Sequence, residues 1–152
     1  RFNLSHTQGL IACAIVLRQD IGIDIENVNR NSANRDIAKR FFSAQEVVDL
    51  SSKPTHSFFD YWTLKESYIK ACGMGLSLPL HKFTFHLDDC IKISFNSDWH
   101  DDPKQWQFWL LEPTPSYRMA IAIHGTENYR LKMKVTIPLI SEQEFDCKVL
   151  NH

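Results

Sequence analysis

Apolar and polar positions follow two different periods along the 152 residues. Residues 10–17 form an unbroken apolar run, and residues 21–26 place isoleucine at every second position. Each pattern predicts a strand, with a turn between them at 18–20. Helical spacing follows in three segments, which we place at 32–42, from 43 onward, and at 56–72 before Gly73 and Gly75.

Strand-like segments return after Gly75. They are rich in aromatic and β-branched residues and lie at 82–87, 91–95, 105–111 and 117–124, with a further candidate at 132–137. Strands first, helices next and strands last are typical of an α+β fold. We therefore predict one α+β unit in which helices pack on an antiparallel sheet.

The amino-acid composition argues against several classes of function. Seventeen basic residues face eighteen acidic ones, for a net charge of −1, so nothing indicates a basic surface for nucleic acid. The longest apolar run is too short to span a bilayer, and no polybasic amphipathic segment is present. The four cysteines form no CxxC pair, which argues against a zinc site and fits a reducing cytoplasm. We expect a cytoplasmic protein that binds neither nucleic acid nor membrane.

Two acids in the second predicted strand are candidates for a metal site. Asp24 and Glu26 lie two residues apart, so on a strand they share one face while Ile23 and Ile25 share the other. Their Cα atoms would be roughly 6.6 Å apart, and carboxylates at that spacing can converge on one Mg²⁺. The alternative is an ordinary edge strand with its acids in water, and this motif alone favours that alternative.

The helix predicted at 56–72 carries three further charged candidates. Lys65 falls within the apolar sector of the helix, where an unpaired charge is costly. A phosphate or another anion would satisfy this lysine, although its stem can also reach water by snorkelling. Glu66 and Lys70 lie side by side at i and i+4 on the border of that sector, where a solvated ion pair is the commoner arrangement.

Glu46 and the amino-terminal segment each have two interpretations. Ser43 and Glu46 form an S-x-x-E capping box, and from the pattern alone capping is favoured over catalysis. Both roles can coexist if one carboxylate oxygen stays free. Ser5 and His6 could hydrogen-bond a phosphate, or His6 could simply lie on the surface. The absence of a GxSxG motif around Ser5 argues against a serine hydrolase.

Five motifs in one order within the first 80 residues resemble the surfactin-synthetase-type 4′-phosphopantetheinyl transferases. They are Phe2-Asn3-Leu4-Ser5-His6, Gly22-Ile23-Asp24-Ile25-Glu26, Arg40-Phe41-Phe42-Ser43 continuing to Glu46, Trp62-Thr63-Leu64-Lys65-Glu66-Ser67 continuing to Lys70, and Gly75-Leu76-Ser77-Leu78-Pro79-Leu80. The resemblance covers about residues 1–125, which we interpret as a transferase domain of this family. Residues 126–152 are then a carboxy-terminal extension.

The resemblance implies an activity and a set of site residues. The activity is Mg²⁺-dependent transfer of 4′-phosphopantetheine from coenzyme A to a serine of an acyl or peptidyl carrier protein, with release of 3′,5′-ADP. The implied metal ligands are Asp24, Glu26 and Glu66. The implied contacts to coenzyme A are Lys65 and Lys70, with Ser5 and His6 near the 3′-phosphate. The implied catalytic residues are Glu66, Glu46 and Lys65. The residues do not decide whether Glu66, Glu46 or a water takes the serine proton.

The resemblance implies a fold of two similar α+β halves, with coenzyme A in the cleft between them. The half that normally precedes the Asn-Leu-Ser-His segment is absent here, so we expect a fragment or a shortened homologue with weak or no activity alone. Two alternatives stay open: a catalytically incomplete module that only binds coenzyme A or carrier protein, and another Mg²⁺-dependent phosphodiester enzyme such as a nuclease. Arg35, Lys39 and Arg40 are candidates for docking an acidic carrier protein.

Overall fold

A four-stranded antiparallel sheet organises the protein, whose computed structural model describes residues 1–30, 34–54, 57–75 and 78–150. The strand order is β10-β6-β7-β3. The bounds are β3 (Ile21–Asn27), β6 (Trp106–Glu112), β7 (Tyr117–His124) and β10 (Lys148–Val149). All neighbouring pairs in this sheet are antiparallel.

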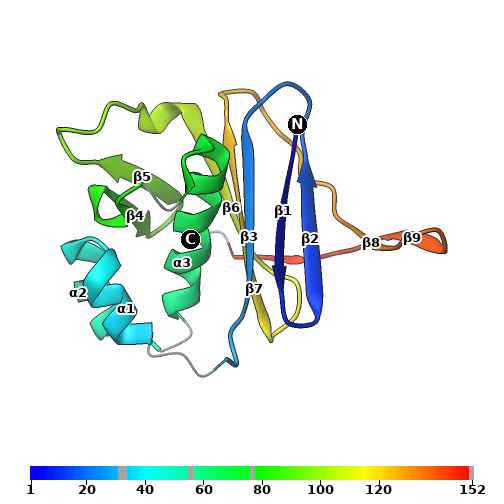
Figure 1. Cartoon of the computed structure of the whole chain (residues 1–152), viewed down its shortest axis with the longest axis horizontal. Coiled ribbons are helices and arrows are strands. Elements are labelled where there is room, and N and C mark those ends of the chain that lie inside the picture. The colour runs from blue at the N-terminus through cyan, green and yellow to red at the C-terminus, as the bar shows by residue number, and fades with distance from the viewer. Residues whose placement is uncertain (31–33, 55–56, 76–77, 151–152) are drawn as a thin grey trace.

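One long helix, α3 (Ser57–Cys72), lies across a face of this sheet (Figure 1). Two shorter helices, α1 (Asn34–Phe41) and α2 (Ala44–Ser51), lie on the far side of α3 from the sheet (Figure 1). Three hairpins complete the fold: β1 (Phe2–Thr7) with β2 (Leu10–Ile15), β4 (Phe83–Leu87) with β5 (Ile91–Phe95), and β8 (Lys134–Ile137) with β9 (Ser141–Glu144). Short 3-10 turns occupy Leu80–Lys82 and Pro103–Gln105.

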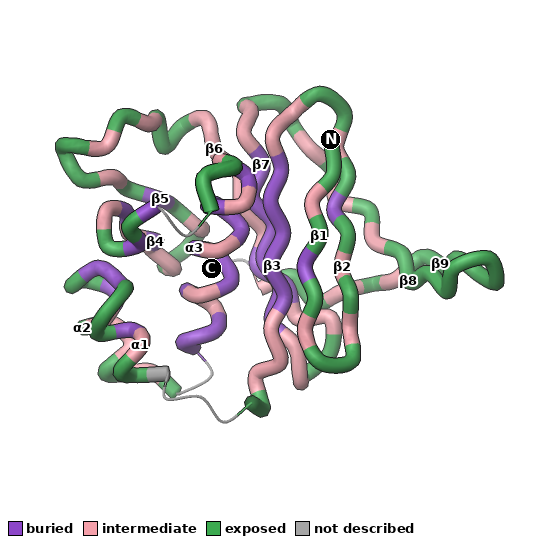
Figure 2. The backbone as a smooth tube through the Cα atoms, viewed as in Figure 1, coloured by how far each residue is buried: buried purple, intermediate pink, exposed green. Residues whose placement is uncertain are grey.

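The core is divided by the sheet into two clusters. Side chains of α3 such as Leu64 and Tyr68 pack on Leu110 of β6 and Ala120 of β7. On the other face, alternate isoleucines of β3 pack with β7 and with the hairpin β1–β2. Figure 2 shows the burial concentrated along β3, β7 and α3. A strand that is buried on both faces can hold a functional side chain only where that side chain has a specific polar partner.

The predicted α+β arrangement of helices on an antiparallel sheet is confirmed. The segments predicted at 91–95 and 117–124 match β5 and β7 to the residue. The predicted helices at 32–42 and 56–72 correspond to α1 and α3, although residues 32, 33 and 56 lie outside the described part. Three strands were not predicted: β1, β9 and β10. Among the described helices, none has both the length and the hydropathy that a bilayer crossing requires.

Candidate active site

Gly22 brings β3 and α3 into direct contact. A Cβ atom at Gly22 would lie 1.9 Å from the carbonyl oxygen of Ser67 and 2.5 Å from the amide nitrogen of Ala71. No side chain fits at those distances, so glycine is required for this approach. The contact brings Glu66 and Lys70 of α3 against the polar face of β3, where Asp24 follows Gly22 by two residues.

Asp24 is the most enclosed acid of β3, with 6% of its surface exposed. Its Oδ1 atom accepts hydrogen bonds from the Ser5 hydroxyl (2.9 Å) and from Lys70 Nζ (2.7 Å). Its Oδ2 atom is buried without a hydrogen-bond partner among the described residues. Burial raises the pKa of Asp24, and the neighbouring Lys70 opposes that shift. β3 is an edge strand of its sheet, but the alternative that places this acid in water is wrong.

Glu26 lies two residues further along the same face of β3. Arg30 forms an ion pair with its Oε2 atom at 3.0 Å, and the Trp62 side chain is hydrogen-bonded to its carboxylate. Burial, followed by the negative charge of Asp24, raises the pKa of Glu26. Asp24 and Glu26 therefore act on each other, as two carboxylates on one strand face are expected to do.

Glu66 completes a group of three mutually repelling carboxylates. Burial is the main cause that raises its pKa to about 7, and the charges of Asp24 and Glu26 act in the same direction, while Lys70 acts against them. Its Oε1 atom is buried and has no hydrogen-bond partner in the described ranges. A carboxyl group with this pKa exchanges a proton near neutral pH, as a general base must.

The predicted Mg²⁺ ligands, Asp24, Glu26 and Glu66, therefore influence one another electrostatically. No three His, Cys, Asp or Glu side chains within the described residues are gathered closely enough to hold a metal ion as they stand. However, one buried oxygen of Asp24 and one of Glu66 have no donor among the residues that the structure describes, and a cation would satisfy such atoms. The chemistry of this donor set fits a divalent ion with oxygen ligands, and the ligand assignment stays a prediction.

Glu46 and Lys65 lie in a separate, fully buried network. Glu46 Oε2 accepts from the Ser43 amide and pairs with Lys65 Nζ, each at 2.9 Å, and Oε1 accepts from the Phe85 amide at 2.8 Å. The Ser43 Oγ atom in turn accepts from the Glu46 amide, so the predicted capping box is confirmed. The predicted anion beside Lys65 is thus Glu46.

Lys65 also contacts main-chain carbonyls and lies over the rings of Phe42 and Phe83. Its Nζ atom donates to the oxygens of Leu80 and Phe83, each at 2.7 Å. Burial lowers the pKa of Lys65 to about 8, against the charge of Glu46. Neither side chain of the pair is exposed. Catalysis by Glu46 and phosphate contact by Lys65 stay predictions, and this geometry supports neither of them.

The two amino-terminal candidates, Ser5 and His6, lie on opposite faces of β1. Ser5 is buried and lies beside Asp24 and Lys70, whereas His6 points to the exposed opposite face of β1. Lys70 Nζ bonds to Ser5 Oγ at 3.0 Å and to the Ile23 carbonyl oxygen at 3.1 Å. The structure therefore brings together Asp24, Ser5 and Lys70, while coenzyme A contact by Ser5 and His6 stays a prediction.

Four polar neighbours of the site were not predicted. Arg30 and Trp62 hold Glu26, and Asn3 and Thr7 bond to main-chain amides of β3. Asn3, Ser5 and Thr7 occupy alternate positions, and that period of two was the available signal for a strand with a polar inner face. Arg30 follows Glu26 at the i, i+4 spacing of a helix, but Glu26 lies on a strand and Arg30 lies beyond its end. Sequence spacing therefore could not predict this ion pair.

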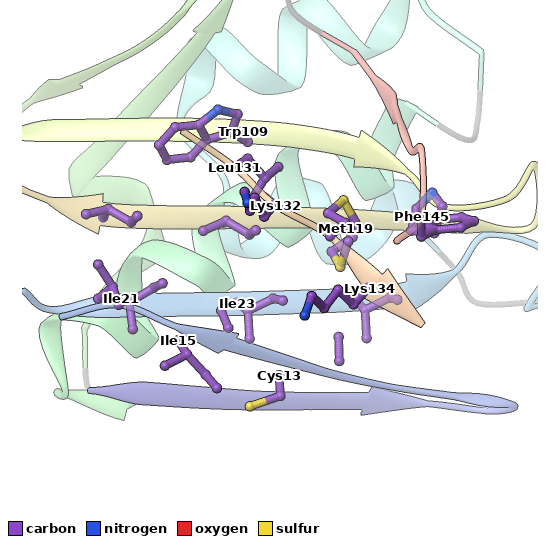
Figure 3. A pocket seen from close by; sticks show the side chains of 18 of the residues that line it. Cys13, Ile15, Ile21, Ile23, Trp109, Met119, Leu131, Lys132, Lys134 and Phe145 are labelled. Atoms are coloured by element: carbon purple, nitrogen blue, oxygen red, sulfur yellow. The ribbon is translucent and has the colours of Figure 1, made fainter. Parts of the chain in front are cut away.

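A cavity of about 410 Å³ lies on the other face of the sheet. Figure 3 shows Ile21, Ile23, Trp109 and Met119 lining it beneath the segment that carries Leu131. Its lining contains no acidic side chain and none of the site side chains Asp24, Glu26, Glu66 and Lys70. The acids, the lysine and the close helix approach are all on the α3 face, so we locate the chemistry there.

The sequence model of the 4′-phosphopantetheinyl transferase superfamily matches residues 20–122. The chain is 40% identical over 124 residues to 4′-phosphopantetheinyl transferase Sfp of Bacillus subtilis (strain 168), which covers 79% of this chain and 53% of that protein. It is 45% identical over 80 residues to 4′-phosphopantetheinyl transferase HetI of a Nostoc species, covering 50% of this chain and 34% of the relative. The chain thus spans about half the length, or less, of these curated relatives.

A solved structure shares the fold. The holo-[acyl-carrier-protein] synthase of Thermotoga maritima superposes with a TM-score of 0.55 at 16% identity, over 86% of this chain and 84% of that one. At this identity the likeness shows a shared fold. Since the superfamily model covers more than half of the sequence and the Sfp relative is 40% identical over 79% of it, the chain belongs to the 4′-phosphopantetheinyl transferase superfamily.

Proposed function

We propose that this chain carries the metal- and coenzyme-A-binding side of an enzyme that transfers 4′-phosphopantetheine from coenzyme A to a serine of an acyl or peptidyl carrier protein. One observation carries the proposal: burial raises the pKa of Asp24, Glu26 and Glu66 beside Lys70, the charge of Asp24 adds to this shift in both glutamates, and one buried oxygen each of Asp24 and Glu66 has no donor among the described residues. Such a set suits a cation that faces phosphate oxygens. The superfamily and the Sfp relative support the same reaction.

The chain's own residues would bind and orient the reactants. We assign Asp24, Glu26 and Glu66 as the groups that hold Mg²⁺, which when bound neutralises pyrophosphate charge. Lys70 is the one cation of α3 that already bonds to the site, and its side chain is 28% exposed, so it can reach a phosphate. Placing positive charge where phosphate charge develops is the main source of catalysis in phosphoryl transfer.

Glu66 is our candidate for the general base. In the transfer, the serine oxygen forms a bond to the phosphorus nearest the pantetheine, and the bond from that phosphorus to 3′,5′-ADP breaks. The serine proton must go to a base, directly or through a water. Glu66 lies beside Asp24 and Glu26 and has a buried oxygen without a hydrogen-bond partner among the described residues, whereas both oxygens of Glu46 are already bonded to other groups. The geometry therefore supports Glu66 over Glu46.

The partner and the setting are part of the proposal. Arg35, Lys39 and Arg40 are exposed on α1, where they suit an acidic carrier protein. We expect a cytoplasmic protein, in agreement with its four free cysteines. The superfamily match leaves the nuclease alternative without support. Residues 1–125 act as the transferase part and 126–152 as an extension, and we expect weak or no turnover from this chain alone.

Calorimetry with coenzyme A tests the proposal. Wild-type protein is titrated with and without Mg²⁺, beside Asp24→Asn and, as a matched control, Asp36→Asn on the exposed surface of α1. We expect binding that requires Mg²⁺, is lost in Asp24→Asn and is kept in Asp36→Asn. Binding that is equal with and without the ion, or equal in both variants, contradicts the metal assignment. Robust turnover by residues 1–152 alone contradicts the expectation of an incomplete enzyme.

A further inference from the structure

Side chains, rather than main-chain bonds, fasten β1 to the open edge of β3. The two strands belong to different sheets, because β1 pairs with β2 while β3 is the last strand of the four-stranded sheet. Three amides of β3 that point away from β7 donate instead to side chains of β1. The bonds run from Ile23 N to Asn3 Oδ1 (3.0 Å), from Ile25 N to Ser5 Oγ (3.2 Å) and from Asn27 N to Thr7 Oγ1 (3.3 Å).

The two-residue repeat of both strands explains why these three side chains meet three amides. Alternate residues of a strand point to one side, so Asn3, Ser5 and Thr7 present three acceptors in a row. The amides at positions 23, 25 and 27 of β3 repeat at the same interval. Edge amides without partners are a liability of open sheets, and this row of side chains satisfies them.

Ser5 differs from its two neighbours because it also touches the candidate site. Its hydroxyl donates to Asp24 Oδ1 at 2.9 Å and accepts from Lys70 Nζ at 3.0 Å and from Ile25 N at 3.2 Å. A serine hydroxyl has one donor and two acceptor positions, so all of its capacity is used. In this arrangement the hydroxyl has none left for a phosphate.

We propose that Ser5 is a positioning residue that holds Asp24 Oδ1 and Lys70 together at the edge of β3, so that Asp24 Oδ2 is the oxygen available to the cation. Asn3 and Thr7 accept from the amides of Ile23 and Asn27 and so attach the strand on either side of Ser5. The inference rests on the proposed function, because it names what orients a metal ligand of that site. It predicts that the Ser5 hydroxyl acts on metal affinity and not on recognition of the nucleotide phosphate.

Two variants of the full-length protein separate this role from simple attachment of β1. Ser5→Ala removes the bonds to Asp24, Lys70 and Ile25, whereas Thr7→Val removes only an attachment bond. Mn²⁺ affinity is measured by electron paramagnetic resonance, and amide exchange at Ile25 and Asn27 by NMR. We expect Ser5→Ala to weaken Mn²⁺ binding about 10- to 100-fold, as loss of a group that orients a ligand does, and Thr7→Val to leave it unchanged. Each variant should speed exchange at its own amide.

Comparing the binding of coenzyme A and of 3′-dephospho-coenzyme A tests the alternative role of Ser5, which is contact with the 3′-phosphate. If Ser5 instead contacts the 3′-phosphate, Ser5→Ala reduces the preference for coenzyme A over the dephospho form and leaves Mn²⁺ affinity intact, which overturns the inference. An unchanged Ile25 exchange rate in Ser5→Ala also overturns it. A wild-type protein that binds no Mn²⁺ sinks the proposed function, and exchange at Ile25 then still decides whether Ser5 fastens the strand. Ser5→Thr, which keeps the hydroxyl, should restore Mn²⁺ affinity at least in part.

Discussion

Lys65 and Glu46 form a 2.9 Å ion pair from which water is fully excluded. The pair joins α3 to the start of α2, and its remaining bonds reach the main chain at Leu80, Phe83 and Phe85. Three segments that are distant in sequence therefore meet at these two side chains. The pair explains why a lysine can occupy the apolar side of α3 without a phosphate.

Removing either charge of this pair should destabilise the protein strongly. Lys65→Met or Glu46→Gln leaves the other group buried without its partner, which typically costs about 3–5 kcal/mol. Urea unfolding measures the loss. Lys53→Met is the control, because Lys53 pairs with Asp49 in a half-exposed pair whose loss should cost less than about 1 kcal/mol. Lys65→Met with unchanged stability and no coenzyme A binding would make Lys65 a ligand contact instead.

Gly22→Ala should separate β3 from α3. The new Cβ would overlap two main-chain atoms of α3, which cannot move aside as a side-chain end can. We expect a loss of at least about 3 kcal/mol in the free energy of unfolding, measured by chemical denaturation. Gly73→Ala is the comparison, because Gly73 has φ 68° and open space around it, so only the backbone cost of about 1–2 kcal/mol applies. Equal losses in the two variants would contradict the close-contact argument.

Glu66 should make the stability of the metal-free protein depend on pH. Its folded pKa of about 7 lies above its usual value of 4.5, so the folded state binds its proton more tightly. The stabilisation is complete below pH 4.5 and is lost as pH rises to about 7. Unfolding midpoints in the presence of a chelator should fall across that window, and Glu66→Gln should flatten the fall.

Metal binding should show the reverse trend. A cation competes with the proton on Glu66, so Mn²⁺ affinity should rise as pH increases through about 7. In the metal-free protein, Asp24→Asn, which removes a repelling charge, should move the pH midpoint of Glu66 downward, as read from the unfolding midpoints in chelator. An affinity that does not change with pH would exclude Glu66 from the ligand set.

Basic side chains on α1 should affect carrier-protein binding through charge alone. Arg35→Glu with Lys39→Glu should weaken the complex several-fold at low salt, and the difference should shrink as salt screens the surface. Surface plasmon resonance with an acidic carrier protein measures both effects. Arg130→Glu with Lys132→Glu, both exposed in the carboxy-terminal segment, is the charge-matched control. Equal losses from both changes would point to net charge rather than to a docking surface.

The regular elements could be predicted because their period is visible in apolar residues. β3 alternates isoleucine with other residues, β7 has a continuous apolar run from Met119 to Ile123, and α2 has its capping box in four consecutive residues. β1 could not be found in that way, because its inner face is polar and its outward Phe2 and Leu4 are exposed. β9 and β10 are short and exposed, so they have no apolar face to detect.

Within the site, sequence spacing could predict neighbours but not distant partners. Asp24 with Glu26 and Glu66 with Lys70 follow from strand and helix geometry. The partner of Lys65 is nineteen positions away on another helix, and only the folded structure pairs it with Glu46. The link from Ser5 to Lys70 spans 65 residues and crosses from one sheet to a helix on the next. No local pattern encodes either contact.

A ladder of main-chain hydrogen bonds forms between almost any two sequences, because every residue other than proline has the same donor and acceptor. The join between β1 and β3 is different, because three particular side chains make it. Substitutions at Asn3, Ser5 or Thr7 can therefore weaken the attachment of β1 to β3, whereas substitutions elsewhere along a strand leave its main-chain hydrogen bonds intact. For anyone redesigning the protein, the amino-terminal hairpin is the part whose attachment must be copied residue by residue.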